Sequence, residues 1–333
     1  MGKFITIKDV AAKAGTSSCT VSYVLSGKKG RYITPEMRKR VEDAVNELNY
    51  VKSRNAASLK GASTKLIAIV VPQFDNQFFT RVVSFAESVL VENGYDIIIF
   101  NTADDHEREM DILNRALQLR VSGVIITPTD KGDEALAYLD SVDLPYVVAD
   151  RKTNYSYIRA SVLTDNYRGG ELAANRLIGC GHRKIGYIGW DSGVPCLDDR
   201  LEAILSVYKG KGEVAVEKDA MDFADGYAAT ERLLKKHPDI TGLIYGFNLQ
   251  AGGGVKYLRE NNIAIPDELS VVVIGTPQWS YIGNDFDRIW LGEREIGRKS
   301  AMLLLSLING EAEKDVHLVQ DCRLDIGKTV KTL

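Results

Sequence analysis

Short apolar runs alternate with amphipathic stretches from Lys65 to near the end of the chain. The runs are rich in Val and Ile, which is typical of parallel strands covered by helices on both faces. They lie at 66–71, 97–100, 124–126, 146–149, 162–163, 185–188, 243–245 and 269–274. Helical spacing is present at 78–92, 106–119, 167–178, 200–209, 226–236, 250–260 and 294–308. The alternation predicts a doubly wound α/β fold, and its two successive series predict two lobes with a cleft between them.

The first 25 residues have a different pattern, that of two short helices joined by a tight turn. Thr6 is a suitable N-cap, and Gly15 tolerates the left-handed conformation that ends a helix. Ser17 can cap the second helix, which would bury Val21, Val24 and Leu25 and leave Ser18, Cys19, Ser22 and Tyr23 outward. The arrangement predicts a DNA-binding helix-turn-helix, with an ordinary helical hairpin as the alternative.

A third helix completes this N-terminal head. Thr34-Pro35 combines an N-cap with proline at the first helical position, and the helical spacing continues to about Leu48. The stretch 53–60 is long enough for one or two helical turns, and the small polar residues that follow it are typical of a linker. We therefore predict a helix-turn-helix domain at 1–50, a hinge helix and linker at 51–64, and a two-lobed domain for effector binding and dimerisation at 65–333.

Charge is divided unevenly along the 333 residues. Residues 1–63 carry a net charge of +7 and the remainder −10, which suits a basic nucleic-acid-binding head on an acidic body. The head lacks the continuous apolar region of a signal peptide, and no apolar run approaches the length of a membrane span. Four scattered cysteines without a C-x-x-C pair favour reduced thiols and a cytoplasmic location.

The residues do not indicate enzymatic chemistry. Gly179-Cys180-Gly181 begins like a dinucleotide fingerprint, but Lys184 occupies the place of the third glycine and the tract precedes a strand. The Gly252–Gly254 tract lacks the spacing of a phosphate loop, and the four histidines lack metal-ligand spacing. A nucleophile elbow is also missing from the sequence. We predict a protein that is not an enzyme, with neither metal nor cofactor.

Combined, these motifs resemble the LacI/GalR family of bacterial transcription regulators over nearly the whole chain. The matching segments are Thr6–Ala11, Ala14-Gly15, Thr20-Val21-Ser22, Val24-Leu25, Asn49-Tyr50, Ala57-Ser58-Leu59, Asn76 with Phe78-Phe79, Gly94-Tyr95, Asp150-Arg151, Asp165-Asn166 with Gly169-Gly170, Gly181–Ile185 and Pro266–Val271. The resemblance implies a homodimeric repressor that binds a near-palindromic operator and responds to a small-molecule effector, with a body like periplasmic binding proteins.

The resemblance also implies which residues of the head contact DNA. Ser18, Cys19 and Tyr23 fall at base-reading positions, while Thr6, Ser17, Thr20 and Ser22 would face phosphates or cap helices. None of the three base-reading side chains can make the bidentate contacts that Arg or Gln makes with purines, so we expect weak or unusual discrimination at these positions. Lys28, Lys29 and Arg31 would supply backbone charge. Core packing for Tyr23 and a solvated basic loop remain the alternatives.

In the family, the linker folds into a hinge helix on DNA and inserts a leucine into the minor groove. Leu59 matches that leucine, Ala56 matches the small residue beside it, and Asn55 lies in the same turn. This chain departs from the pattern nearby, with Lys52-Ser53 in place of Pro-Asn and Ala57 in place of Arg. The missing arginine puts one DNA contact in doubt.

For the effector site, the resemblance gives a set of residues and two departures. Arg200 and Asn248 match ligand-binding residues, but Leu249 and Gly275 replace two sugar-binding aspartates. Candidate lining residues are Phe74, Phe79, Asp130, Asp150, Arg151, Asp165, Phe223 and Trp279, with Phe247 also near the expected cleft. A sugar derivative, a less hydroxylated ligand and a protein co-regulator all remain open.

Two other function classes compete with the regulator. A small-molecule binding protein of the periplasmic type would share the two-lobed body, but the basic head and the lack of a signal peptide count against it. A nucleotide-dependent α/β enzyme is disfavoured by the incomplete glycine motifs.

Overall fold

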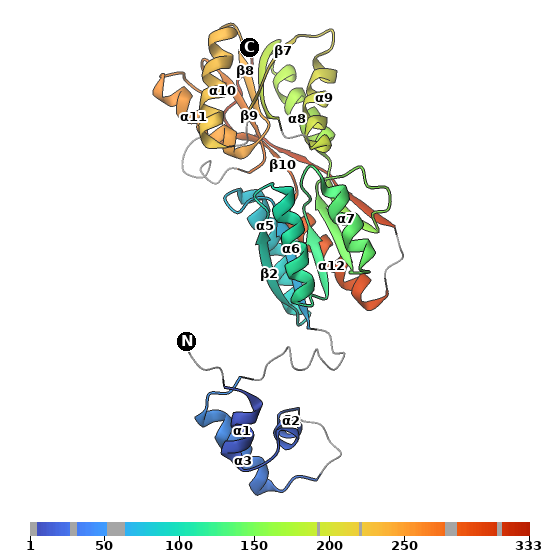
Figure 1. Cartoon of the computed structure of the whole chain (residues 1–333). Helices are drawn as coiled ribbons and strands as arrows, with labels where there is room; N and C mark the ends of the chain where they lie inside the picture. The colour runs from blue at the N-terminus through green and yellow to red at the C-terminus, as the bar shows by residue number, and fades with distance from the viewer. Residues whose placement is uncertain are drawn as a thin grey trace. The chain divides into compact units, whose positions relative to one another are not determined.

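The computed structural model describes residues 5–26, 32–51, 64–191, 194–219, 222–276, 285–311 and 315–333, and the side chains of 195 and 196 are not described. The chain divides into two compact units, Met1–Thr64 and Lys65–Leu333 (Figure 1). Most of the predicted hinge and linker therefore lies outside the described residues, as do Lys28, Lys29, Arg31, Asn55, Ala56, Leu59 and Trp279.

The first unit contains three helices, α1 (Ile7–Ala14), α2 (Ser18–Ser26) and α3 (Pro35–Glu47). Their ends follow the capping chemistry that the sequence predicts. The Thr6 hydroxyl accepts from the Asp9 N–H, Gly15 has a φ of 65°, and the Thr34 hydroxyl accepts from the Met37 N–H. The buried core consists of Val10, Ala11, Ala14, Val21, Val24, Val41 and Ala44. Leu25, Val45 and Leu48 pack against it while remaining partly exposed.

The first lobe of the second unit is built on a six-stranded parallel sheet with the order β11-β5-β4-β3-β1-β2. The strands are β1 (Leu66–Val71), β2 (Asp96–Asn101), β3 (Gly123–Ile126), β4 (Tyr146–Asp150), β5 (Ala160–Thr164) and β11 (Val316–Gln320). One face packs on α5 (Gln77–Glu92) and α12 (Glu293–Asn309), and the other on α6 (His106–Gln118) and α7 (Gly132–Ser141).

The second lobe repeats this architecture with the order β12-β10-β9-β8-β6-β7. Its strands are β6 (Lys184–Trp190), β7 (Glu213–Asp219), β8 (Gly242–Tyr245), β9 (Ser270–Ile274), β10 (Asp287–Trp290) and β12 (Arg323–Asp325), which runs antiparallel to β10. Its helices are α8 (Asn166–Gly179), α9 (Pro195–Tyr208), α10 (Phe223–Lys236) and α11 (Asn248–Glu260). The predicted doubly wound, two-lobed α/β fold is confirmed.

The sequence predicted two lobes from two successive series of strands and helices. In the structure, however, the lobes are not two consecutive halves of the chain. Helix α12 comes after the second series of strands, yet it packs against α5, β4 and β5 of the first lobe (Figure 1). Strand β11 then joins β5 at the edge of the same sheet. The chain therefore passes between the lobes three times, after β5, after β10 and after β11.

The glycine tract at 252–254 has a packing role in α11. A Cβ atom on Gly253 would overlap the carbonyl oxygen of Phe223, and one on Gly254 would overlap the Tyr245 hydroxyl. Helix α11 therefore approaches α10 at backbone distance, which only glycine allows here. The glycines at 252–254 are therefore explained by close helix packing. They do not need to form a phosphate loop, whose spacing they lack.

Candidate nucleic-acid interface and ligand cavity

Helix α2 presents the candidate DNA-reading surface of the first unit. Its start is fixed by Ser17, whose hydroxyl accepts from the Thr20 N–H at 3.2 Å and also bonds the Thr20 hydroxyl at 3.0 Å. Cys19 and Ser17 are exposed, whereas Ser18, Thr20, Ser22 and Tyr23 are half-buried. Because Val21 and Val24 face the core, the remaining sides of α2 are accessible to a partner.

Thr6 lies at the start of α1 and is engaged in a capping box. Its N–H donates to the Asp9 carboxylate at 2.8 Å, and its hydroxyl lies 2.6 Å from the same carboxylate. These contacts hold the exposed end of α1 in a fixed conformation. A helix N-terminus also favours phosphate through its N–H groups and dipole, so Thr6 is compatible with the backbone contact predicted for it.

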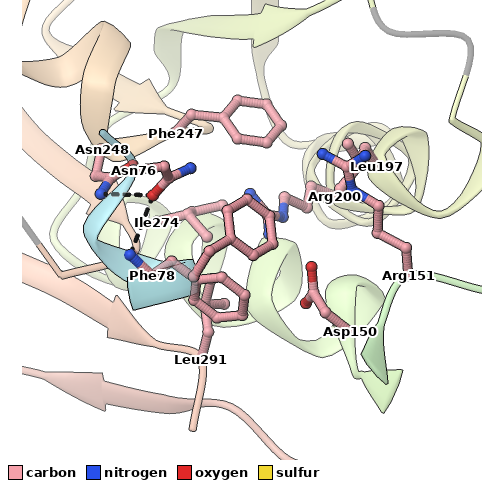
Figure 2. A pocket seen from close by; sticks show the side chains of 12 residues that line it. Asn76, Phe78, Asp150, Arg151, Leu197, Arg200, Phe247, Asn248, Ile274 and Leu291 are labelled. Atoms are coloured by element: carbon pink, nitrogen blue, oxygen red, sulfur yellow. Dashed lines mark hydrogen bonds between the residues drawn. The ribbon is translucent and has the colours of Figure 1, made fainter. Parts of the chain in front are cut away.

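A small cavity of about 30 Å³ lies between the two lobes of the second unit, at the carboxyl ends of their strands (Figure 2). Asp150 ends β4, Phe247 follows β8, and Gly275 follows β9. Parallel strands place their following loops at one edge of a sheet, where ligands of α/β proteins bind. The lining residues are Asn76, Phe78, Phe79, Asp150, Arg151, Leu197, Arg200, Phe247, Asn248, Ile274, Gly275 and Leu291.

Two buried arginines line the cavity, and each is held by a different set of partners. Arg200 donates from Nε to Asn166 at 2.7 Å and from Nη1 to the carbonyl of Gly246 at 2.5 Å. Its guanidinium also lies 4.7 Å from the centre of the Phe247 ring. Arg151 donates to both carboxylate oxygens of Asp104, at 2.5 and 3.4 Å. Arg151 is thereby charge-compensated, whereas Arg200 donates these two hydrogen bonds to neutral acceptors.

Asp150 is the acid among the lining residues, and its backbone is strained. Its φ is 69°, in the left-handed region that a non-glycine residue seldom adopts. The hydroxyl of Thr164 donates to its Oδ1 at 2.5 Å. Burial raises the pKa of Asp150, and the Thr164 bond and the charges of Arg151 and Arg200 oppose that shift in part.

A direct hydrogen bond joins the two lobes across the cavity. Asn76 of the first lobe caps α5 by accepting from the Phe78 N–H at 3.1 Å, and the same oxygen accepts from Asn248 Nδ2 at 3.3 Å (Figure 2). At a second crossing, Lys152 lies 2.7 Å from Asp199 of α9. These contacts hold the lobes together around the cavity.

The structure brings together only part of the predicted effector site. Phe79, Asp150, Arg151, Arg200 and Asn248 line the cavity together with Phe247 and Gly275. Four predicted residues lie elsewhere: Phe74 and Phe223 are each 48% exposed, Asp130 is exposed beside α7, and Asp165 caps α8. The Asp165 carboxylate accepts from the Arg168 N–H as the cap of α8, and proximity to a strand end does not reveal that role.

Other lining residues were missed as site residues by sequence reasoning. Asn76, Phe78 and Leu197 each line the cavity, although only Asn76 and Phe78 carried a signal. An asparagine that caps a helix directly after a buried strand lies at the carboxyl edge of the sheet, and the aromatic residue behind it shares that position. Leu197 comes from the first turn of α9, and its pattern is that of an ordinary buried leucine.

Comparison with known proteins agrees with both units. Residues 6–53 match the model of bacterial regulatory proteins of the lacI family, and residues 67–312 match a periplasmic binding protein domain. The transcriptional repressor PurR of Vibrio parahaemolyticus is 31% identical over 340 residues, covering 98% of this chain and 99% of that protein. The chain belongs to the LacI family.

Solved structures of LacI-family proteins resemble this chain closely in fold. A transcriptional regulator from Silicibacter pomeroyi superposes with a TM-score of 0.84 at 27% identity, covering 98% of this chain and 99% of that one. A regulator from Enterococcus faecalis, solved with bound ribose, has a TM-score of 0.73 at 25% identity and covers 80% and 99%. LacI-family members are transcriptional regulators, so the alternative of a nucleotide-dependent enzyme is excluded and the chain is not an enzyme. Among the described residues, no helix is long and apolar enough to cross a bilayer.

Proposed function

We propose that this chain is a cytoplasmic transcriptional repressor that binds a near-palindromic operator as a homodimer and is controlled by a small-molecule effector. The observation that carries the DNA-binding part is the capped pair α1 and α2, in which Ser17 fixes the start of α2 and Cys19 is exposed. In helix-turn-helix proteins, the second helix enters the major groove and the first crosses the backbone. The net charge of +7 on residues 1–63 provides the sequence-independent attraction to phosphate.

Ser18, Cys19 and Tyr23 read base edges in this proposal, and Thr6, Ser17, Thr20 and Ser22 contact phosphates or cap helices. Lys28, Lys29 and Arg31 add backbone charge, and Asn55, Ala56 and Leu59 bind the minor groove as a hinge. Discrimination at the first three positions comes from contacts with thymine methyl groups and from the Tyr23 ring, because none of them can bind a purine bidentately.

The DNA-binding part is tested with duplexes that the full-length chain selects from a random library. We expect the full chain to bind a near-palindromic duplex and to lose affinity steeply as salt rises, by about 10³–10⁵ between 50 and 200 mM if six to ten phosphates are contacted. Residues 65–333 alone, the matched control, should bind at least about 100-fold more weakly because they lack the phosphate and base contacts. Fluorescence anisotropy measures both.

If the full chain binds no selected duplex at low salt, with or without ligand, the repressor proposal is wrong. Retained small-molecule binding would then favour the alternative of a binding protein without DNA function. A protein co-regulator in place of the small molecule has no observation in its favour.

The dimer forms, in this proposal, through the face of the first lobe made by α5 and β2. Strand β2 is an edge strand, and Phe74 and Ile99 beside α5 are 48% and 40% exposed. Val83 and Ile97 line the same hollow as these two residues. An exposed edge strand with apolar side chains is a surface on which another chain can pack. In the proposed dimer, the same surface of a second copy covers it, which gives a self-complementary interface with two-fold symmetry.

Replacing Ile99 with glutamate should weaken dimerisation by at least about tenfold, because each copy would bury a charge in the interface. Sedimentation equilibrium measures the change. The matched control is Leu205→Glu, an exposed residue of α9 in the second lobe, which should leave the dimer constant unchanged. Equal effects from both variants would place the interface elsewhere.

A further inference from the structure

The cleft between the two lobes is too small for an organic ligand in this arrangement. Its cavity of about 30 Å³ has room for about two water molecules, since one water needs roughly 10–15 Å³. Pockets for small organic ligands usually measure about 300–1,000 Å³. An effector can therefore bind in this cleft only if side chains move or the lobes separate.

Arg151 lies in the cleft and contacts both lobes. It is 1% exposed and is the largest fully buried side chain among the described residues. Its guanidinium carbon lies 5.6 Å from the centre of the Phe79 ring, in α5 of the first lobe. The same carbon lies 5.4 Å from the centre of the Trp190 ring, at the end of β6 in the second lobe. Because desolvated cation–aromatic contacts are worth about 2 kcal/mol, the contact with Trp190 favours closed lobes.

The backbone around Arg151 is strained. Asp104 accepts from Arg151 Nη1 at 2.5 Å, and the carbonyl of Pro128 accepts from the same nitrogen at 3.2 Å. The φ angle is 54° at Asp104, 55° at the preceding Ala103 and 69° at Asp150, directly before Arg151. Non-glycine residues adopt this left-handed region at a cost, and such strain is concentrated at ligand clamps and switch regions. Three strained residues thus hold the Arg151–Asp104 ion pair in the cleft.

The next residue makes a second contact with the other lobe. Lys152 Nζ lies 2.7 Å from Oδ2 of Asp199, in α9 of the second lobe. The two side chains are 47% and 27% exposed, so this ion pair contributes about 1 kcal/mol at most. Buried Arg151 therefore provides the larger share of the attraction, and Lys152 adds to it at the rim of the cleft.

We propose that Arg151 and Lys152 form a latch that holds the two lobes closed by contacts within the chain, so that an effector binds only after the latch opens. This inference rests on the proposed effector-controlled function and adds the direction of the conformational change. A ligand that fits only the open form shifts the population toward that form. Arg151, which the sequence predicted to bind the effector, instead excludes it from the closed cleft.

A distance between one label on each lobe tests the latch without DNA or ligand. In the full-length protein, exposed Gln118 of α6 and exposed Ser206 of α9 are replaced by cysteine and labelled, with Cys19 and Cys196 changed to serine. The other two cysteines are buried. Single-molecule energy transfer is measured on dimers that contain one labelled copy. We expect one narrow distance distribution for this reference chain.

Two variants should open the lobes, and one should not. Arg151→Met removes the charge and the planar group, and it should shift the distribution to longer distances. Trp190→Leu removes the ring of the second lobe and leaves the Arg151–Asp104 pair in place, so it tests the same contact if Arg151→Met misfolds. The matched control is Arg159→Met, which removes ion pairs that lie within the first lobe and should keep the reference distribution.

The size of the shift should follow the burial of the contact. Lys152→Met should open the lobes less than Arg151→Met, because an exposed pair contributes less than a buried contact. The latch proposal is overturned if a folded Arg151→Met or Trp190→Leu chain keeps the reference distribution, or if Arg159→Met shifts it as far.

The operator assay separates this inference from the proposed function. If Arg151→Met opens the lobes, its operator affinity should differ by at least about fivefold from that of Arg159→Met, because coupling between sites is typically of this size or larger. Open lobes with unchanged operator affinity leave the latch intact and overturn control of the operator through the lobes. Unchanged distances with intact operator binding overturn the latch alone. If the lobes open but no form of the chain binds a duplex, the latch holds and the repressor proposal fails.

Discussion

Replacing Asp287 with alanine is expected to lower the free energy of unfolding by about 3–5 kcal/mol, because it leaves a paired arginine without its counter-charge. Asp287 is fully buried at the start of β10, where Oδ1 accepts from Arg176 Nε at 2.6 Å. Its Oδ2 accepts from the Thr329 N–H at 3.0 Å. One carboxylate thus joins α8, β10 and the C-terminal segment.

Urea denaturation of the variant and of a surface control measures this effect. Glu171→Ala removes the exposed pair with Arg168, and its expected cost is at most about 1 kcal/mol. Asp287→Asn retains an oxygen for the Thr329 N–H and should fall between the two. If Asp287→Ala costs no more than Glu171→Ala, the buried pair does not stabilise the second lobe.

The second large effect is expected at Gly253, where alanine should lower the free energy of unfolding by about 1–3 kcal/mol. The added methyl group would overlap the Phe223 carbonyl oxygen and lie close to the Tyr227 nitrogen, both on the backbone of α10. Backbone cannot move aside as a side chain can, so the two helices must separate. The loss exceeds the gain of up to about 1 kcal/mol that alanine brings to a helix.

The matched control is Gly179→Ala at the end of α8, where nothing lies within 4 Å of the added atom. It should leave the stability unchanged or raise it by up to about 1 kcal/mol. Thermal and urea unfolding of both variants distinguishes close helix packing from a general effect of removing glycine. Similar losses for both would show that the α10–α11 contact is not the cause.

Local chemistry in the sequence was sufficient for the head and for most of the α/β pattern. Helix capping depends on contacts with residues only a few positions away. The capping roles of Thr6, Gly15, Ser17 and Thr34 could therefore be predicted without knowledge of the fold. Continuous apolar runs likewise identified the strands that are covered on both faces.

Edge elements and the site were harder to predict, because tertiary context decides them. Strands β7, β10, β11 and β12 carry charged or polar residues among their apolar ones, and a search for continuous apolar runs passes over them. Helix α7 was missed as well. In the cavity, Asn76 and Asn248 form a hydrogen bond although they are 172 residues apart in the sequence. A local sequence pattern cannot predict such a contact.

The three passages of the chain between the lobes have a consequence for the order in which the protein can fold on the ribosome. Synthesis completes β1 to β5 early, but α12 and β11, which cover and extend that sheet, are made only after β6 to β10 of the second lobe. Domains commonly fold as units during synthesis, N-terminal parts first. Here the lobe that is begun first cannot be completed until five strands of the second lobe have been made, so a stop codon directly after β10 would remove α12 and β11 from the first lobe and β12 from the second.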